Sequence, residues 1–372
     1  MDPSLATNIP LVDLAAQHAE VESEVLSGLE DVFATTAFIG GAAVGQFEEA
    51  YAAWLGVKHC IGVANGTDAL ELALRATGVG PGCEVVLPVN TFIATAEAVV
   101  RIGAVPVFVD VDPVHLLIDP ALVAEAVGDR TRAIVPVHLF GQTAPVEQLR
   151  AVAESCGAVI IEDAAQAQGA TRHGSSAGSL GAAAGTSFYP GKNLGAAGDA
   201  GAVTTNDPEI ARGVRMLASH GSATKYVHDV VGFNSRLDTI QAVILNAKLR
   251  RLSAWNDSRR EAAARYSEML DDVPGAAAPI SAEGNDDVWH LYVIRVADRD
   301  RILASLNGTG IGAGIHYPTP LHLSGAFAHL GLGPGTFPVA ERAAGEILSL
   351  PLHPHITIAQ QKFVVETLRA AL

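Results

Sequence analysis

Lys192 is one of only five lysines in this sequence, and it lies where a reactive amine is expected. It belongs to Ser187–Gly195, a segment rich in Gly and Pro that follows a strand-like apolar run. Because ligands of open α/β sheets bind at the loops after parallel strands, an amine here can serve as nucleophile or as general acid and base. A P-loop is excluded, since the required first glycine and the Ser or Thr after the lysine are missing. Taken alone, such a lysine is more often an ordinary turn residue.

Two other segments carry groups that could act with this amine. The apolar run Val159–Gln166 passes through Glu162 and Asp163, so a buried strand ends in two carboxylates. Such a carboxylate usually caps the following helix, but it could also meet a cationic group. The segment Ala64–Ala69 has the pattern of a strand, a turn of small residues and a helix start, where backbone N–H groups can bind phosphate. The alternative for this segment is an ordinary helix N-cap.

Together, the three features match the needs of one cofactor, pyridoxal phosphate. Lys192 would attach the cofactor covalently, and Asp163 would keep its pyridine nitrogen protonated. The helix start after Asn65 would hold the phosphate. The sequence therefore predicts a pyridoxal-phosphate site assembled from three separate segments.

Elements that could position these groups alternate along the first two-thirds of the chain. The strand-like runs are His59–Ala64, Glu84–Pro88, Val105–Val111, Ala133–Leu139, Ala158–Asp163, Ala182–Phe188 and Gly201–Thr205. The helical segments between them include Thr67–Thr77, Thr91–Ile102, Val146–Cys156 and Pro208–Ser219. Several runs are apolar on both faces, as parallel strands covered by helices should be. The alternation predicts an α/β fold with a large, doubly wound, mostly parallel sheet.

A different pattern begins after Asn234. Ser235–Asp238 opens a long helical region to Leu270, either as one helix or with a break near Trp255. Beyond it the pattern predicts a strand, a helix, a loop rich in Pro and His, and two final helices. We therefore expect a large domain over residues 1–250 and a smaller C-terminal α/β domain over residues 251–372. Lys248, on the long helix, is expected on a solvated face.

Composition limits the classes of partner. The 372 residues are 49% hydrophobic and 17% charged, which excludes disorder, and no apolar stretch is long enough to cross a bilayer. The formal net charge of −16 opposes binding to nucleic acid, so a phosphate-bearing ligand must be held by local groups. Cys60, Cys83 and Cys156 are too scattered for a disulfide framework or a metal site and are predicted to be buried thiols. Without a signal-peptide pattern, a cytoplasmic location is expected.

Six motifs in the sequence resemble those of a known family. They are Asn-Gly-Thr-Asp-Ala-Leu (65–70), Pro-x-Asn-Thr-Phe-Ile-Ala-Thr (88–95), Glu-Asp-Ala-Ala-Gln (162–166), Ser-Phe-Tyr-Pro-Gly-Lys-Asn-Leu-Gly (187–195), Gly-Asp-Ala-Gly-Ala (198–202) and Gly-Phe-Asn-Ser-Arg-Leu-Asp (232–238). In order and spacing the chain resembles the nucleotide-sugar aminotransferases of the DegT/DnrJ/EryC1/StrS family. The resemblance implies pyridoxal-phosphate fold type I, which is aspartate-aminotransferase-like, and a homodimer with shared active sites.

The resemblance also implies roles for individual residues. Lys192 would bind the cofactor covalently, and Asp163 would partner the pyridine nitrogen. The other implied cofactor contacts are Gln166 at the phenolic oxygen, Phe92 on the ring face, Gly66, Thr67 and Ser187 at the phosphate, and Asn234 from the second subunit. His316 and Tyr317 match a substrate loop. Gln168 is a departure, because many relatives have His there, which puts a family role for that side chain in doubt.

The implied reaction transfers an amino group from L-glutamate, through pyridoxal phosphate, to a keto group of a nucleotide-linked deoxysugar. The stretches 221–228 and 232–238 look more like the 3-aminotransferases of antibiotic deoxysugar pathways, which favours a dTDP-linked 3-keto-6-deoxysugar. The alternative is a 4-aminotransferase acting on a 4-keto-6-deoxy nucleotide sugar. Lys225, Tyr226, His228 and Arg236 form a local cluster of donors that could hold the diphosphate, unless they simply belong to a solvated loop.

Two further alternatives have different sequence requirements. Sugar 3-dehydratases related to this family carry His at the position of the reactive lysine and need an iron–sulfur partner, so Lys192 argues against that activity. A non-catalytic regulatory protein that binds pyridoxal phosphate would be expected to lose the lysine. The chain keeps all the expected groups, which favours an enzyme.

Overall fold

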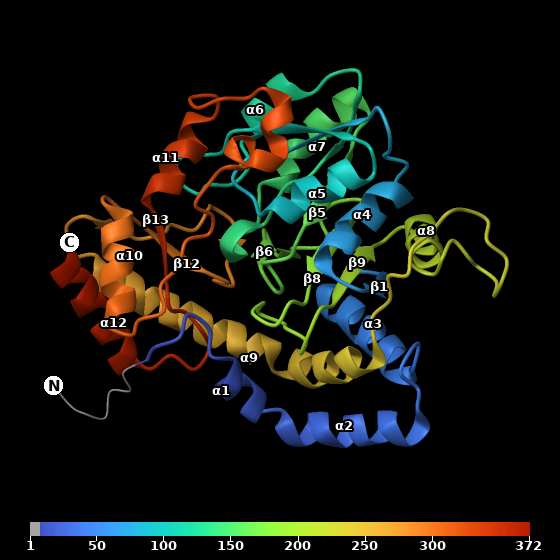
Figure 1. Cartoon of the computed structure of the whole chain (residues 1–372), viewed down its shortest axis with the longest axis horizontal. Helices are drawn as coiled ribbons and strands as arrows, with labels where there is room; N and C mark the ends of the chain where they lie inside the picture. The colour runs from blue at the N-terminus through green and yellow to red at the C-terminus, as the bar shows by residue number, and fades with distance from the viewer. Residues whose placement is uncertain (1–7) are drawn as a thin grey trace.

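The computed structural model describes residues 8–372, and a seven-stranded sheet forms its centre (Figure 1). The strand order is β1-β9-β8-β5-β4-β2-β3. The strands are β1 (His59–Val63), β2 (Glu84–Pro88), β3 (Val105–Val109), β4 (Thr131–Ile134), β5 (Val159–Asp163), β8 (Ala183–Ser187) and β9 (Gly201–Thr205). Only the two pairings of β9 are antiparallel, so the predicted mostly parallel α/β sheet is confirmed.

Six of the seven strands lie within two residues of their predicted bounds, and one differs more. The run predicted as Ala133–Leu139 pairs as Thr131–Ile134, so the strand starts two residues earlier than predicted and is shorter. Regular pairing ends just before Pro136, which has no N–H to donate to a neighbouring strand. Beyond it, Val137 and Asp163 still form an isolated parallel bridge. The chain thus stays beside β5 after the strand itself has ended.

Helices cover both faces of the sheet, as a doubly wound fold requires. Helices α4 (Gly66–Ala76), α5 (Ile93–Arg101) and α8 (Pro208–Ala218) share one apolar cluster with Val85 and Leu87 of β2. Helices α6 (Pro120–Ala126) and α7 (Val146–Cys156) pack on the other face, with Val86. Because consecutive side chains of a strand point to opposite faces, this strand is apolar at every position from Val85 to Pro88.

Three helices that the sequence pattern did not identify precede the sheet. They are α1 (Leu14–Ala19), α2 (Glu22–Thr35) and α3 (Ala42–Leu55). Helix α2 packs against the long helix α9 (Thr239–Leu270), and α3 packs against both α9 and β1. The N-terminal helices therefore cover the long helix instead of leaving it on the surface (Figure 1).

Helix α9 runs unbroken through Trp255, so the alternative of a break there is wrong. Trp255 is buried against Val21 and Val25, and its indole N–H donates to Glu20 at 3.0 Å. The prediction that Lys248 lies on a solvated face is also wrong. Its side chain is buried, Nζ donates to the carbonyl of Gly195 at 2.8 Å, and burial lowers its pKa to about 8.

The C-terminal part forms a second, smaller sheet with its own helices. Strands β10 (Ala276–Ala277), β12 (Tyr292–Val296) and β13 (Ile347–Leu350) pair in that order, beside α10 (Arg299–Gly308), α11 (Pro338–Glu346) and α12 (Ile358–Ala371). Leu245 and Leu252 of α9 pack with the large domain, whereas Tyr266 and Leu270 pack with the C-terminal core. We keep residue 250, within α9, as the proposed domain boundary.

Short elements complete the structure. Strands β6 (Thr171–Arg172), β7 (Ser175–Ser176) and β11 (Asn285–Asp286) form a third sheet, and the 3-10 helices are Leu139–Gly141, Leu321–Leu323 and Gly325–Leu330. Cys60 is buried as predicted, but Cys83 and Cys156 are partly exposed. Within residues 8–372, no helix is long and apolar enough to cross a membrane, and no three His, Cys, Asp or Glu side chains are grouped to hold a metal ion.

Candidate active site

A cavity of about 420 Å³ lies at the carboxyl ends of the central strands. It brings together nine residues predicted from the sequence, namely Gly66, Thr67, Phe92, Asp163, Gln166, Ser187, Lys192, His316 and Tyr317. They come from segments far apart along the chain, so the sheet topology assembles the site as expected for an α/β fold.

One end of the cavity is suited to a phosphate. Helix α4 begins at Gly66, and Asn65 caps it by accepting from the backbone N–H of Asp68 at 2.8 Å. A Cβ atom at Gly66 would lie 2.5 Å from Cβ of Ser187, so only glycine lets the helix start approach the end of β8 this closely. The first N–H groups of a helix have no partner within the helix and favour anions. The predicted N-cap is therefore present, and the phosphate site stays a prediction.

Asp163 supplies a fixed, buried carboxylate on the cavity wall. Its Oδ2 accepts from the hydroxyl of Thr95 at 2.6 Å, and its Oδ1 accepts from the backbone N–H of Ala165 at 3.1 Å. Thr95 Oγ1 lies 2.8 Å from Thr91 Oγ1. No role was predicted for these threonines from the sequence, although their i,i+4 spacing within the 88–95 motif could have indicated that their side chains lie together. The fixed carboxylate fits a protonated ring nitrogen.

Glu162 does not share the cavity with its neighbour. It is fully buried on the opposite side of β5, because successive side chains of a strand alternate. Its carboxylate accepts from the backbone N–H groups of Gly178, Leu180 and Gly181, and from Nε2 of His138 at 2.8 Å. Glu162 thus holds the chain segment that leads into β8, while Asp163 faces the cavity.

Gln166 and two aromatic rings form another part of the wall. Gln166 accepts from the backbone N–H of Phe140 at 2.7 Å and donates to the hydroxyl of Tyr317 at 3.1 Å. The rings of Phe92 and Tyr317 have centroids 5.2 Å apart, and Phe92 is 50% exposed. The exposed ring leaves Phe92 available for the stacking role predicted from the sequence.

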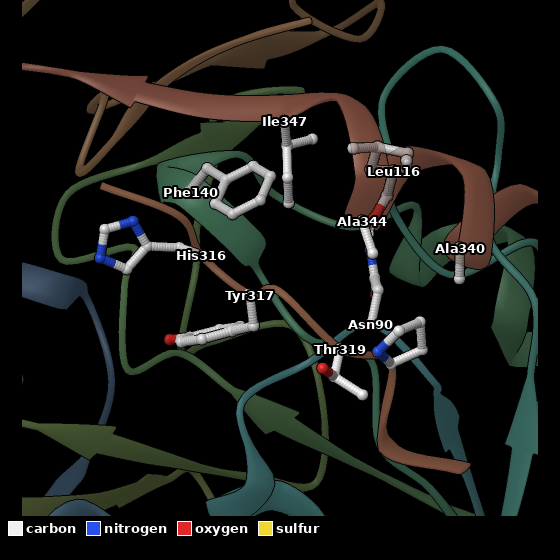
Figure 2. A pocket seen from close by; sticks show the side chains of 11 residues that line it. Asn90, Leu116, Phe140, His316, Tyr317, Thr319, Ala340, Ala344 and Ile347 are labelled. Atoms are coloured by element: carbon white, nitrogen blue, oxygen red, sulfur yellow. Dashed lines mark hydrogen bonds between the residues drawn. The ribbon is translucent and has the colours of Figure 1, made fainter. Parts of the chain in front are cut away.

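His316 and Tyr317 extend from one loop beneath Phe140 and Ile347, away from the alanines of α11 (Figure 2). Nδ1 of His316 lies 2.8 Å from Oγ of Ser349. Burial, together with the charge of Lys192, lowers the pKa of His316. The imidazole is therefore uncharged near neutral pH, next to a cationic amine.

Lys192 is positioned by a closed loop. Its backbone N–H donates to the carbonyl of Tyr189, and the N–H of Ala196 donates to Phe188, both at 2.8 Å. Burial lowers the pKa of Lys192 to about 8, although the charge of Asp163 opposes this shift. A minor fraction of the amine, about one tenth, is therefore unprotonated at neutral pH, in the form that a nucleophile or general base requires.

The remaining predicted residues do not line this cavity in the same chain. Lys225, Tyr226 and His228 lie on an exposed loop that projects from the body after α8 (Figure 1). Asn234 and Arg236 are exposed near its base. Within the loop, Lys225 Nζ lies 5.1 Å from the ring centroid of Tyr226. The roles predicted for these five residues, with Asn234 acting from a second subunit, stay predictions.

The site is completed by two residues for which the sequence did not indicate a position there. His290 lines the cavity directly, and sequence reasoning had only placed it in a strand. Gln168, the departure from the family pattern, is buried behind the site and donates to Thr186 Oγ1 at 3.0 Å and to the carbonyl of Ser187 at 2.9 Å. It therefore supports the end of β8 structurally.

Known proteins are similar to this chain in sequence and in structure. The model of the DegT/DnrJ/EryC1/StrS aminotransferase family matches residues 19–369. The erythromycin biosynthesis sensory transduction protein EryC1 of Saccharopolyspora erythraea is 47% identical, covering 98% of this chain and 99% of the relative. The dTDP-3-amino-3,4,6-trideoxy-alpha-D-glucose transaminase of Streptomyces venezuelae is 43% identical, covering 97% and 95%. The crystal structure of S. venezuelae DesV in complex with a ketimine intermediate superposes with a TM-score of 0.95 at 43% identity, covering 98% of each chain.

Proposed function

Because this chain belongs to the DegT/DnrJ/EryC1/StrS family of pyridoxal-phosphate-dependent sugar aminotransferases, we propose that it aminates the 3-keto group of a dTDP-linked 6-deoxysugar, with L-glutamate as amino donor. The observation that carries the choice of substrate is the match to the S. venezuelae transaminase, whose name specifies a dTDP-linked 3-amino sugar. This relative matches almost the whole chain, including the segments that line the cavity.

Residues on the cavity wall fit the cofactor. The start of α4 at Gly66 and Thr67, with Ser187, would hold its phosphate. Asp163 would keep a proton on the ring nitrogen, and Gln166 would contact the phenolic oxygen. Phe92 would cover one ring face. When bound, pyridoxal phosphate supplies an electron-accepting ring that carries the amino group from donor to acceptor.

Lys192 would move the proton during each half of the reaction. As a free amine it takes a proton from the reacting carbon of the donor, and as an ammonium it returns a proton at the other carbon. Its pKa of about 8 suits both roles, since protonated and unprotonated forms coexist near neutral pH. The neutral imidazole of His316 adds no competing positive charge beside it.

A shared active site predicts complementation between two inactive variants. Asn234 is exposed and absent from the cavity of its own chain, as expected for a residue that reaches a partner's site. Co-expression of Lys192→Ala and Asn234→Ala subunits should restore about one quarter of wild-type activity, because random pairing makes half the dimers mixed and each has one intact site. That fraction applies to the unfractionated mixture; dimers purified through tags on both subunits are all mixed and should show about half of wild-type activity. Mixed dimers without activity would contradict the shared site.

The role proposed for the exposed loop predicts that a substitution in it weakens binding of the sugar substrate selectively. If Lys225 holds the diphosphate, Lys225→Ala should raise the KM for the nucleotide sugar by ~10-fold, the cost of one lost hydrogen bond to a charged group. The half-reaction with glutamate should stay nearly unchanged. Steady-state kinetics and single-turnover reactions with glutamate separate the two effects. An equal loss in both halves would show that Lys225 acts on the fold or the cofactor instead.

The choice of keto position is tested with purified enzyme and two matched substrates. Offered the 3-keto and 4-keto isomers of one dTDP-6-deoxysugar with L-glutamate, the enzyme should convert the 3-keto isomer, and the product is identified by NMR. Efficient amination of the 4-keto isomer with no reaction of the 3-keto isomer would make it a 4-aminotransferase. Replacing L-glutamate with other amino acids tests the donor.

A further inference from the structure

Lys248 is a buried lysine on α9, and the roles described above do not include it. Its Nζ donates to the carbonyl oxygen of Gly195 at 2.8 Å. Burial lowers the pKa of Lys248 to about 8, and within residues 8–372 no acidic side chain opposes this shift. A buried ammonium without a counter-ion is costly, and an apolar side chain of similar length would fill the position without that cost. What the amine adds is its contact with Gly195.

Gly195 belongs to the loop that carries Lys192, and this loop closes on itself around that residue. A Cβ atom at Gly195 would lie 2.2 Å from the carbonyl oxygen of Pro190, so the chain after Lys192 touches the chain before it. The backbone N–H of Ala196 donates to the carbonyl of Phe188 at 2.8 Å and closes the loop a second time. A shift of Gly195 therefore displaces the chain on both sides of Lys192.

Two further polar side chains of α9 bind the same loop. Gln241 accepts from the backbone N–H of Ala197 at 2.8 Å, and Oδ1 of Asn256 accepts from Nδ2 of Asn193 at 3.0 Å. Gln241 lies seven residues before Lys248 and Asn256 lies eight residues after it, which is about two helical turns in each direction. The helix thus holds the loop at three points, all on the carboxyl side of the reactive amine.

We propose that Lys248 is a positioning residue, whose buried amine holds the carbonyl of Gly195 and so fixes the loop that presents Lys192 to the cavity. The side chain of Lys192 is long and flexible, so the backbone that carries it must be held firmly for its amine to enter the cavity in one direction. The inference rests on the proposed role of Lys192 as the reactive lysine. Its tests use neither cofactor nor substrate, so a wrong assignment of the reactive lysine would leave their results standing.

The first test measures amide hydrogen exchange of the loop in full-length protein freed of cofactor. Lys248→Met keeps the length of the side chain but cannot donate. Exchange of the Lys192 and Ala196 N–H groups, followed by mass spectrometry, should become ~10-fold faster, as expected for the loss of one hydrogen bond from a charged group. The control Lys362→Met, on an exposed part of α12, should exchange as the wild type does. Unchanged exchange in folded Lys248→Met protein would overturn the proposal.

The second test measures the pKa of Lys192 in the same proteins. The pH dependence of its reaction with fluorodinitrobenzene is followed on the Lys192 peptide by mass spectrometry. Burial is the main cause that lowers this pKa to about 8, so a loosened loop that admits water in Lys248→Met should raise it by about one unit. An unchanged pKa in the folded variant would contradict the positioning role.

A third variant separates positioning from the loss of a charge. Removing the charge of Lys248 would by itself also raise the pKa of Lys192, whereas Gln241→Met removes a loop contact without any change of charge. Gln241→Met should therefore also raise this pKa and speed exchange in the loop. A pKa that rises only in Lys248→Met would reveal a charge effect and overturn the proposal. Gln241 is partly exposed, so Gln241→Met decides if Lys248→Met fails to fold.

Discussion

Lys192→Ala is expected to abolish turnover and to leave the cofactor without a covalent link to the protein. The buried amine with a pKa of about 8 is the group in the cavity best suited to both tasks. Loss of a general acid and base alone typically costs ~10²–10⁴-fold in rate. The measurement combines steady-state rates with borohydride reduction and peptide mapping of the bound cofactor.

A matched control is available for this variant. Lys362 is exposed on α12, far from the cavity lining, so Lys362→Ala should keep both activity and the covalent link. If borohydride still fixed the cofactor to Lys192→Ala protein, another lysine would hold it. The buried Lys248, whose pKa is also about 8, would then be the next amine to examine.

Asp163→Asn is expected to cost ~10²–10⁴-fold in activity while the protein stays folded. Asparagine has nearly the same shape, and its single oxygen can still accept from the backbone N–H of Ala165 while its Nδ2 donates to the hydroxyl of Thr95, but it has no charge to hold a proton on the ring nitrogen. Removal of one partner from a buried ion pair typically costs ~3–5 kcal/mol, which sets the size of the rate loss. Rates, cofactor content and thermal unfolding are measured on the same preparations.

The neighbouring carboxylate should respond in a different way. Glu162→Ala removes an acceptor shared by three backbone N–H groups and His138 in a fully buried position. Unpaired buried donors are costly, so its free energy of unfolding should fall by several kcal/mol, about 3–5 by the same rule. Folded Glu162→Ala protein should keep more activity than Asp163→Ala. Equal losses of activity in folded protein would refute the assignment of Asp163.

Much of the fold was readable from local pattern. The strands of the large sheet are buried on both faces, so they appear as short apolar runs, as β2 does at Val85, Val86 and Leu87. Lys192 and Asp163 could be singled out because Asp163 ends a strand and Lys192 lies in the loop after another, at the edge where ligands of such sheets bind. The motifs around them also implied the family, which the comparisons confirm.

Other features depend on contacts that no local pattern encodes. The amphipathic spacing of α9 suggested solvent at Lys248, but α2 and α3 cover the helix and Gly195 accepts from its amine. Along the sequence Glu162 and Asp163 are equivalent neighbours, and only the packing on each face of β5 makes one an anchor and the other a cavity residue.

The sequence by itself was enough to predict the strands of the sheet to within a few residues, the cofactor and the proposed reactive lysine, because those predictions depend on residue type and short-range order. The tertiary structure alone decided burial, hydrogen-bond direction and pKa. Thr95 beside Asp163, and His290 beside Asn193, come from segments far apart in the chain. The charge and tautomer of a side chain are set by its neighbours in space, and those neighbours exist only once the chain has folded.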